Sequence, residues 1–173
     1  PELIQDFVSH GIISNAISEN KLSISTWNPR EFSEDKNGRL DDRPYGGGSG
    51  MVLQPEPIIK TVDAIKKENE TYVVCMAPHG TVLNQQKLLE LSKKENLTII
   101  SGRYEGIDNR VEEACVDEVC SVGDYILNGG ELPALILLEG ISRLIKGVLG
   151  DGNSIVEESF NNGLLEFPQY TRP

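Results

Sequence analysis

The sequence predicts an α/β fold in which a mostly parallel sheet is flanked by helices. Short apolar runs rich in β-branched residues alternate with amphipathic segments through the middle of the chain, an order typical of parallel βαβ units. A length of 173 residues suits one well-packed domain. Glycine-containing loops follow the predicted strands, at the position where α/β proteins bind their ligands.

The N-terminal third predicts a helix over residues 3–17 and a strand over 22–27, where apolar and polar residues alternate. Residues 31–50 are polar and then very rich in glycine, which predicts a mobile loop. This loop is not a nucleotide-binding P-loop, because no Gly-Lys-Ser/Thr follows the glycines.

The middle of the chain predicts the sheet itself. The expected elements are a strand over 71–76, a loop over 77–81, a helix over 85–96, a strand over 97–101, a loop over 102–106, a helix over 107–115 and a further strand with a bend over 119–127. Three loops, 77–80, 101–106 and 128–133, would then follow strands and converge into a site. A glycine after a strand is usually a plain turn, so each loop alone is a weak signal.

Residues 132–145 are apolar nearly all round, which predicts a helix that is either deeply buried or part of a subunit interface. Pro133 suits the first turn of such a helix. The stretch from 151 to 173 reads mostly as loop.

Composition excludes several classes of protein. The formal net charge of −11 argues against a nucleic-acid clamp over the whole surface, although it allows a local basic patch. No apolar run reaches membrane-spanning length. The three cysteines lie in apolar contexts, as expected for reduced core thiols in a cytosolic protein, and the two histidines have no zinc-ligand spacing. We therefore expect no metal site of that kind and no membrane contact.

Six motifs carry a specific resemblance. They are W-N-P-R (27–30), D-D-R-P-Y-G-G-G-S-G-M (41–51), G-R-Y-E-G-I-D-N-R (102–110), S-V-G-D-Y-I-L-N-G-G-E-L-P (121–133), G-V-L-G (147–150) and E-S-F-N-N-G-L-L-E-F-P-Q-Y-T-R-P (158–173). Together and in this order they closely resemble the bacterial tRNA (guanine-N1)-methyltransferase family, TrmD. The resemblance spans almost the whole chain.

The resemblance implies a SPOUT methyltransferase fold, whose C-terminal part is threaded into a deep trefoil knot. It implies a cytoplasmic homodimer that transfers a methyl group from S-adenosylmethionine to N1 of guanosine 37 in tRNA. Residues 1–150 would form the S-adenosylmethionine-binding domain without its first strand, and 151–173 would form an interdomain linker. The helical tRNA-binding domain of the family would be absent from this chain.

The resemblance also assigns the donor pocket. Its residues are Pro78, Gly80, Gly102, Tyr104, Glu105, Val122, Gly123, Asp124, Tyr125, Ile126, Leu127, Gly129, Gly130 and Pro133. Glycines let the backbone approach a ligand, because no Cβ stands in the way. Backbone groups from Val122 to Leu127 suit the adenine edge, and Glu105 suits the sulfonium, the methionine tail or a divalent ion such as Mg²⁺. The alternative for 121–133 is a tight strand-to-helix turn around a buried aspartate.

The same resemblance points to a catalytic base and a cation. Guanine N1 carries a proton that a carboxylate must take, and a cation near O6 would stabilise the negative charge that develops there. Glu158 occupies the position of the family's aspartate base. Its side chain is one methylene, about 1.5 Å, longer than that of aspartate. Glu157 is the alternative candidate for the base. Arg143 matches the family's catalytic arginine; a plain charge at a helix C-terminus is its alternative.

The tRNA-binding residues implied by the resemblance are Asp41, Arg43, Gly50, Glu166 and Arg172. Three positions depart from the family pattern: Ala77 and His79 stand where a small polar residue and Gln are usual, and Ser49 replaces a common proline.

Two other functions remain open at this point. One is a SPOUT-fold module that binds RNA or cofactor without catalysis, which the change from aspartate to Glu158 mildly favours. The other is an NAD-binding α/β protein, which predicts a G-x-G-x-x-G motif that this sequence lacks.

Overall fold

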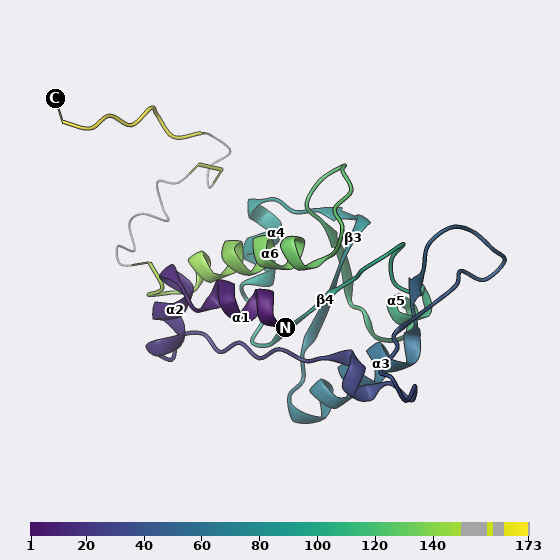
Figure 1. Cartoon of the computed structure of the whole chain (residues 1–173). Coiled ribbons are helices and arrows are strands. Elements are labelled where there is room, and N and C mark those ends of the chain that lie inside the picture. Colours follow the sequence, from purple (N-terminus) through teal and green to yellow (C-terminus); the bar gives the residue numbers. More distant parts are fainter. Residues whose placement is uncertain (150–158, 161–164, 173) are drawn as a thin grey trace.

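A computed structural model of the chain describes residues 1–149, 159–160 and 165–172 (Figure 1). In chain order its elements are α1 (Glu2–Val8), α2 (Gly11–Ser18), the 3-10 helix η1 (Pro29–Phe32), β1 (Asp41–Asp42), β2 (Val52–Leu53), α3 (Pro55–Glu68), β3 (Tyr72–Val82), α4 (Gln85–Leu91), β4 (Leu97–Ser101), α5 (Arg110–Cys115), β5 (Glu118–Ser121) and α6 (Glu131–Leu144). The predicted α/β class is confirmed.

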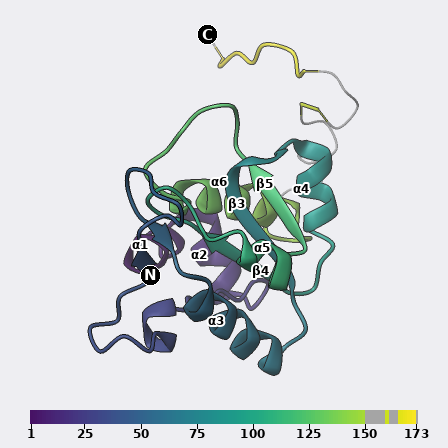
Figure 2. The same cartoon turned by 90° about the vertical axis from the view of Figure 1, so that its right-hand side faces the viewer.

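The main sheet is parallel and has the order β4-β3-β5 (Figure 2). Met76 of β3 lies opposite Ser101 of β4 and Cys120 of β5, so the three strands reach the same level at their carboxyl ends. A second, two-stranded ladder joins β1 to β2 in antiparallel fashion. The chain segments that leave the three parallel strands therefore start from one edge of the sheet.

Both faces of the sheet are covered by helices. Val73 and Cys75 of β3 pack with residues of α3 and α5, whereas Val74 and Met76 pack on the other face with residues of α4 and α6. Side chains alternate between the faces of a strand, so a strand buried on both sides must be apolar at every position. This explains the unbroken run V-V-C-M at the centre of the sheet.

The three cysteines are buried and free, as predicted. Burial raises the pKa of the Cys75 thiol to about 12 and that of Cys120 to about 11. Both stay protonated at neutral pH and act as small core residues, not as nucleophiles.

The N-terminal prediction needs two corrections. The single helix over 3–17 is wrong: the chain forms α1 and α2, which are separated by Ser9 and His10, and Gly11 begins α2 with a φ of +66°. The strand over 22–27 is also wrong. Residues 22–28 form no strand, and the alternation in the sequence arises because Leu22, Ile24 and Thr26 are half-buried while Ser23 and Ser25 are exposed.

The middle of the chain differs from its prediction in three places. The loop over 77–81 is wrong, because β3 continues to Val82 after a shift in its pairing with β5. Helix α4 ends at Leu91 instead of 96, and α5 begins at Arg110 instead of 107. The strand over 97–101 is confirmed.

Helix α3 was not predicted at all, although its sequence carries two signals. Pro55 occupies the first helical position, where a missing N–H costs nothing. Ile58, Thr61 and Val62 then follow at helical spacing and are buried.

The predicted apolar helix over 132–145 is confirmed as α6, with Pro133 buried in its first turn. One face of α6 packs into the core, but Leu132 and Ile136 on another face are 53% and 50% exposed. No helix among the described residues is long and apolar enough to cross a membrane.

Candidate functional site

Two of the three predicted loops touch through their backbones. The N–H of Gly130 donates to the carbonyl oxygen of Gly102 at 2.7 Å, and Arg103 forms an isolated antiparallel bridge with Gly129. The loop after β4 and the turn before α6 therefore form one continuous surface at the carboxyl edge of the sheet.

The paired glycines of this turn have separate structural reasons. A Cβ on Gly130 would lie 2.7 Å from the backbone nitrogen of Gly102 and 2.9 Å from Cα of Ser101. A Cβ on Gly129 would collide with Glu131 and approach Nε of Arg103 to 3.0 Å. The space that these two glycines leave is thus filled by the protein's own atoms, not held open for a ligand.

The third predicted loop, residues 77–80, is part of β3 itself. Met76 and Thr81 both pair with Cys120 of β5, so residues 77–80 bulge out of the ladder between them. A Cβ on Gly80 would lie 2.6 Å from the backbone of Val119 and Cys120. The bulge carries Pro78 at the surface, and the His79 ring lies 3.1 Å from a carboxylate oxygen of Glu112 on α5.

Residues 122–127 follow β5, which ends at Ser121, and the chain turns sharply at Gly123, where φ is +145°. The Ser121 hydroxyl accepts from the Gly123 N–H at 3.1 Å, and the Tyr125 hydroxyl donates to the carbonyl of Val122 at 3.3 Å. Asp124, Tyr125, Ile126 and Leu127 are all exposed. The exposed position of Asp124 contradicts a turn built around a buried aspartate.

The glycine-rich segment reaches the loop after β4. The backbone N–H of Glu105 donates to the carbonyl of Met51 at 3.0 Å, and a Cβ on Gly50 would collide with the Glu105 side chain. Gly50, predicted to bind the tRNA, therefore lies against Glu105, predicted to bind the donor. Tyr104 precedes it with a φ of +61° and is 57% exposed.

The other predicted site residues lie on elements outside the three loops or outside the described residues. Asp41 is half-buried in β1, opposite Leu53, and Arg43 is exposed just after it. Arg143 is half-buried in the last turn of α6. The catalytic candidates Glu158 and Glu157 lie outside the described residues.

Glu166 and Arg172 lie in an exposed segment that Figures 1 and 2 both show away from the sheet. The Glu166 N–H donates to the Ser159 hydroxyl at 3.0 Å. The structure does not bring these two residues to the three loops.

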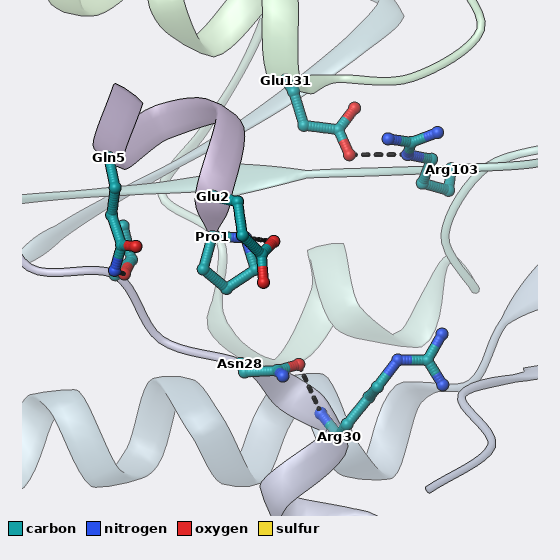
Figure 3. A network of polar contacts seen from close by, with 8 residues as sticks. Pro1, Glu2, Gln5, Asn28, Arg30, Arg103 and Glu131 are labelled. Atoms are coloured by element: carbon teal, nitrogen blue, oxygen red, sulfur yellow. Dashed lines mark hydrogen bonds and ion pairs between the residues drawn. The ribbon is translucent and has the colours of Figure 1, made fainter. Parts of the chain in front are cut away.

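Sequence reasoning missed one pair of residues at this site. The Arg103 guanidinium donates through Nε to Oε1 of Glu131 at 2.6 Å, and Figure 3 shows the two side chains pointing toward one another. The available signal was a charged residue embedded in each of two glycine motifs, G-R-Y-E-G and N-G-G-E-L-P.

A surface hollow of about 420 Å³ lies elsewhere. It is lined by Tyr72, Lys87, Glu90, Leu91, Lys93, Lys94 and Glu118. Tyr72 and Glu118 begin β3 and β5, so this hollow lies at the amino ends of the strands, opposite the three loops. Lys87 donates hydrogen bonds to Glu118 and Glu90, which raise the pKa of Lys87. These ion pairs neutralise much of the charge that lines the hollow.

Within the described part of the chain, no cluster of His, Cys, Asp or Glu could hold a metal ion.

Comparison with known proteins gives a consistent result. The sequence profile of the family described as "tRNA (Guanine-1)-methyltransferase TrmD" matches residues 1–173. The chain is 47% identical over 175 residues to a tRNA (guanine-N(1)-)-methyltransferase of Pseudoalteromonas atlantica, covering all of this chain and 66% of that protein. It is 48% identical over 174 residues to the protein of the same name from Thermosipho africanus, covering all of this chain and 70% of that protein.

Among solved structures, the crystal structure of tRNA (m1G37) methyltransferase from Aquifex aeolicus matches with a TM-score of 0.84. The sequence identity is 40%, and the match covers all of this chain and 72% of the other. The chain thus spans about two thirds of the length of the first of these relatives.

Proposed function

Because the chain belongs to the tRNA (guanine-1)-methyltransferase family TrmD, we propose that it methylates N1 of guanosine 37 in tRNA, with S-adenosylmethionine as the methyl donor. The observation that carries this proposal is the match of the family over residues 1–173. The contact between two of the glycine loops at the carboxyl edge of the sheet, where α/β proteins bind ligands, supports it.

The residues present fit S-adenosylmethionine. In the turn from Val122 to Leu127, residues 124–127 are exposed, and among the described residues the N–H groups of Ile126 and Leu127 donate to no backbone carbonyl. Such groups can bind the polar edge of an adenine. The bulge with Pro78 and Gly80 and the loop with Gly102 and Tyr104 start from the same edge; Pro133, in the first turn of α6, supports the wall formed by the paired glycines.

The bound donor supplies an electrophilic methyl group on a sulfonium. The chain's own work is to hold guanine N1 in line with that methyl at near-attack distance and to remove the N1 proton. In this proposal the Glu158 carboxylate accepts the N1 proton, with Glu157 as the alternative base. The guanidinium of Arg143 stabilises the negative charge that develops on O6.

Substrate binding is proposed for Asp41, Arg43 and Gly50, with Glu166 and Arg172 ordering around the tRNA. The contact between Gly50 and Glu105 supports this division, because it links the glycine-rich segment to the donor loop. A Mg²⁺ ion held by Glu105 remains part of the proposal, with the tRNA or the donor supplying further ligands.

We further propose a cytoplasmic homodimer with the deep trefoil knot of the SPOUT fold. The exposed Leu132 and Ile136 on α6 support a subunit interface, since paired apolar residues on a helix face are commonly covered by a partner.

Methyl transfer is tested with a tRNA transcript, the chain and labelled S-adenosylmethionine. We expect label in N1-methylguanosine at position 37, and none in a matched transcript with adenosine at that position. Binding of the donor without transfer would instead support the non-catalytic SPOUT module. Binding of NAD but not S-adenosylmethionine in calorimetric titration would contradict both.

A further inference from the structure

The ion pair between Arg103 and Glu131 joins two segments that are 28 residues apart in sequence. Arg103 belongs to the loop after β4, and Glu131 is the first residue of α6. Among the described residues, it is the only ion pair that links two of the three glycine loops of the proposed donor pocket. The Glu131 side chain is 24% exposed and that of Arg103 56%.

The backbone around the pair is shaped to accommodate it. Arg103 faces Gly129 across an isolated bridge, and the next residue, Gly130, donates to Gly102 at 2.7 Å. A Cβ on Gly129 would occupy the space of the Glu131 carboxylate and lie 3.1 Å from Cδ of Arg103. The glycine at 129 is therefore needed for the side-chain contact, whereas the glycine at 130 is needed for the backbone contact.

We propose that Arg103 and Glu131 are positioning residues that fix the spacing of these two loops before the methyl donor binds. This inference rests on the proposed function. An exposed ion pair adds little to folding stability, because water and salt screen the attraction between its charges. Loops held in their binding conformation bind more tightly, however, because less ordering is required when the ligand arrives. The pair acts mainly on donor affinity and little on stability.

The test is a double-mutant cycle on the affinity for S-adenosylhomocysteine, measured by calorimetry. Arg103→Met and Glu131→Gln are each expected to raise the Kd about tenfold. The double variant is expected to match either single variant, because removing one partner already removes the link. The KM for S-adenosylmethionine should rise by a similar factor, while kcat at saturating donor stays within about threefold.

Arg110→Met is the matched control. Arg110 also forms an ion pair, at 2.8 Å to Asp108, but its partner is only two residues away in sequence and the pair links no two loops. Its loss is expected to change the Kd less than about twofold. Thermal melting of all variants identifies any that fail to fold. If Arg103→Met fails to fold, the Kd of Glu131→Gln still tests the proposal.

Three results would overturn the proposal. Single variants that bind like the unaltered chain would show that the pair does not position the loops. If the increases in Kd of the two single variants multiply in the double variant, the two residues act separately. If only Arg103→Met loses affinity, Arg103 contacts the ligand directly. If the unaltered chain binds no S-adenosylhomocysteine, the proposed function itself fails, and this inference fails with it.

Discussion

Replacing Arg143 by alanine is expected to slow methyl transfer to guanosine 37 by about 10²- to 10³-fold, the usual cost of removing one group that stabilises developing negative charge. The Kd for S-adenosylmethionine should stay within about threefold, because the proposed donor pocket is built mainly from backbone at other loops. Single-turnover rates at saturating donor, with calorimetric titration of the same protein, separate the two effects.

Lys146 provides the matched control for that variant. It is an exposed cation three residues beyond Arg143, so Lys146→Ala removes the same formal charge from the same end of α6. Its rate should change less than about threefold. A rate in Arg143→Ala above about a tenth of the unaltered value would remove Arg143 from the catalytic assignment and leave it as a charge at a helix C-terminus.

Replacing Gly130 by alanine is expected to lower the free energy of unfolding by about 2–3 kcal/mol and to weaken binding of S-adenosylhomocysteine more than about tenfold. The φ of Gly130 is −79°, which any residue can adopt, so the cost arises from contact alone. The atoms in the way belong to the backbone of Ser101 and Gly102 and cannot rotate aside. Denaturant unfolding and calorimetry measure the two losses.

Gly140→Ala is the control for this prediction. Gly140 lies in the same helix, and the three atoms nearest to its added Cβ all belong to the Leu88 side chain, the nearest 2.7 Å away; this side chain can change rotamer. Its cost should remain below about 1 kcal/mol, since alanine is the better helix former. Equal stability of the two variants would show that the close packing of Gly130 on the strand end is unimportant.

The sheet could be predicted because a strand that helices cover on both faces must be a short, continuous apolar run. Residues 97–101 form a strand as predicted, and the apolar run in β3 is buried on both faces by helices. The alternation of apolar and polar residues over 22–27 did not predict a strand correctly. Side chains can also alternate between half-buried and exposed positions in a segment that pairs with no other strand. The extension of β3 to Val82 depends on a bulge opposite Cys120, which no local pattern reveals.

The contact between two of the predicted loops could be expected from the sequence in outline and not in detail. The rule that ligands bind at the carboxyl ends of parallel strands was enough to select the three loops. The contact of Gly50 with Glu105 and the ion pair of Arg103 with Glu131 join distant parts of the chain, and only the folded structure brings them together. The roles of Glu158 and Arg143 came from the family resemblance, because a single charged residue in a sequence has no chemical signature of its own.

The most direct test of the central claim is a crystal structure of the chain with S-adenosylhomocysteine. We expect the adenine against the backbone of residues 122–127, with the bulge at 77–80 and the loop at 102–105 around the rest of the ligand. A ligand bound in the hollow beside Tyr72 and Lys94, or anywhere else away from these three loops, would contradict the account.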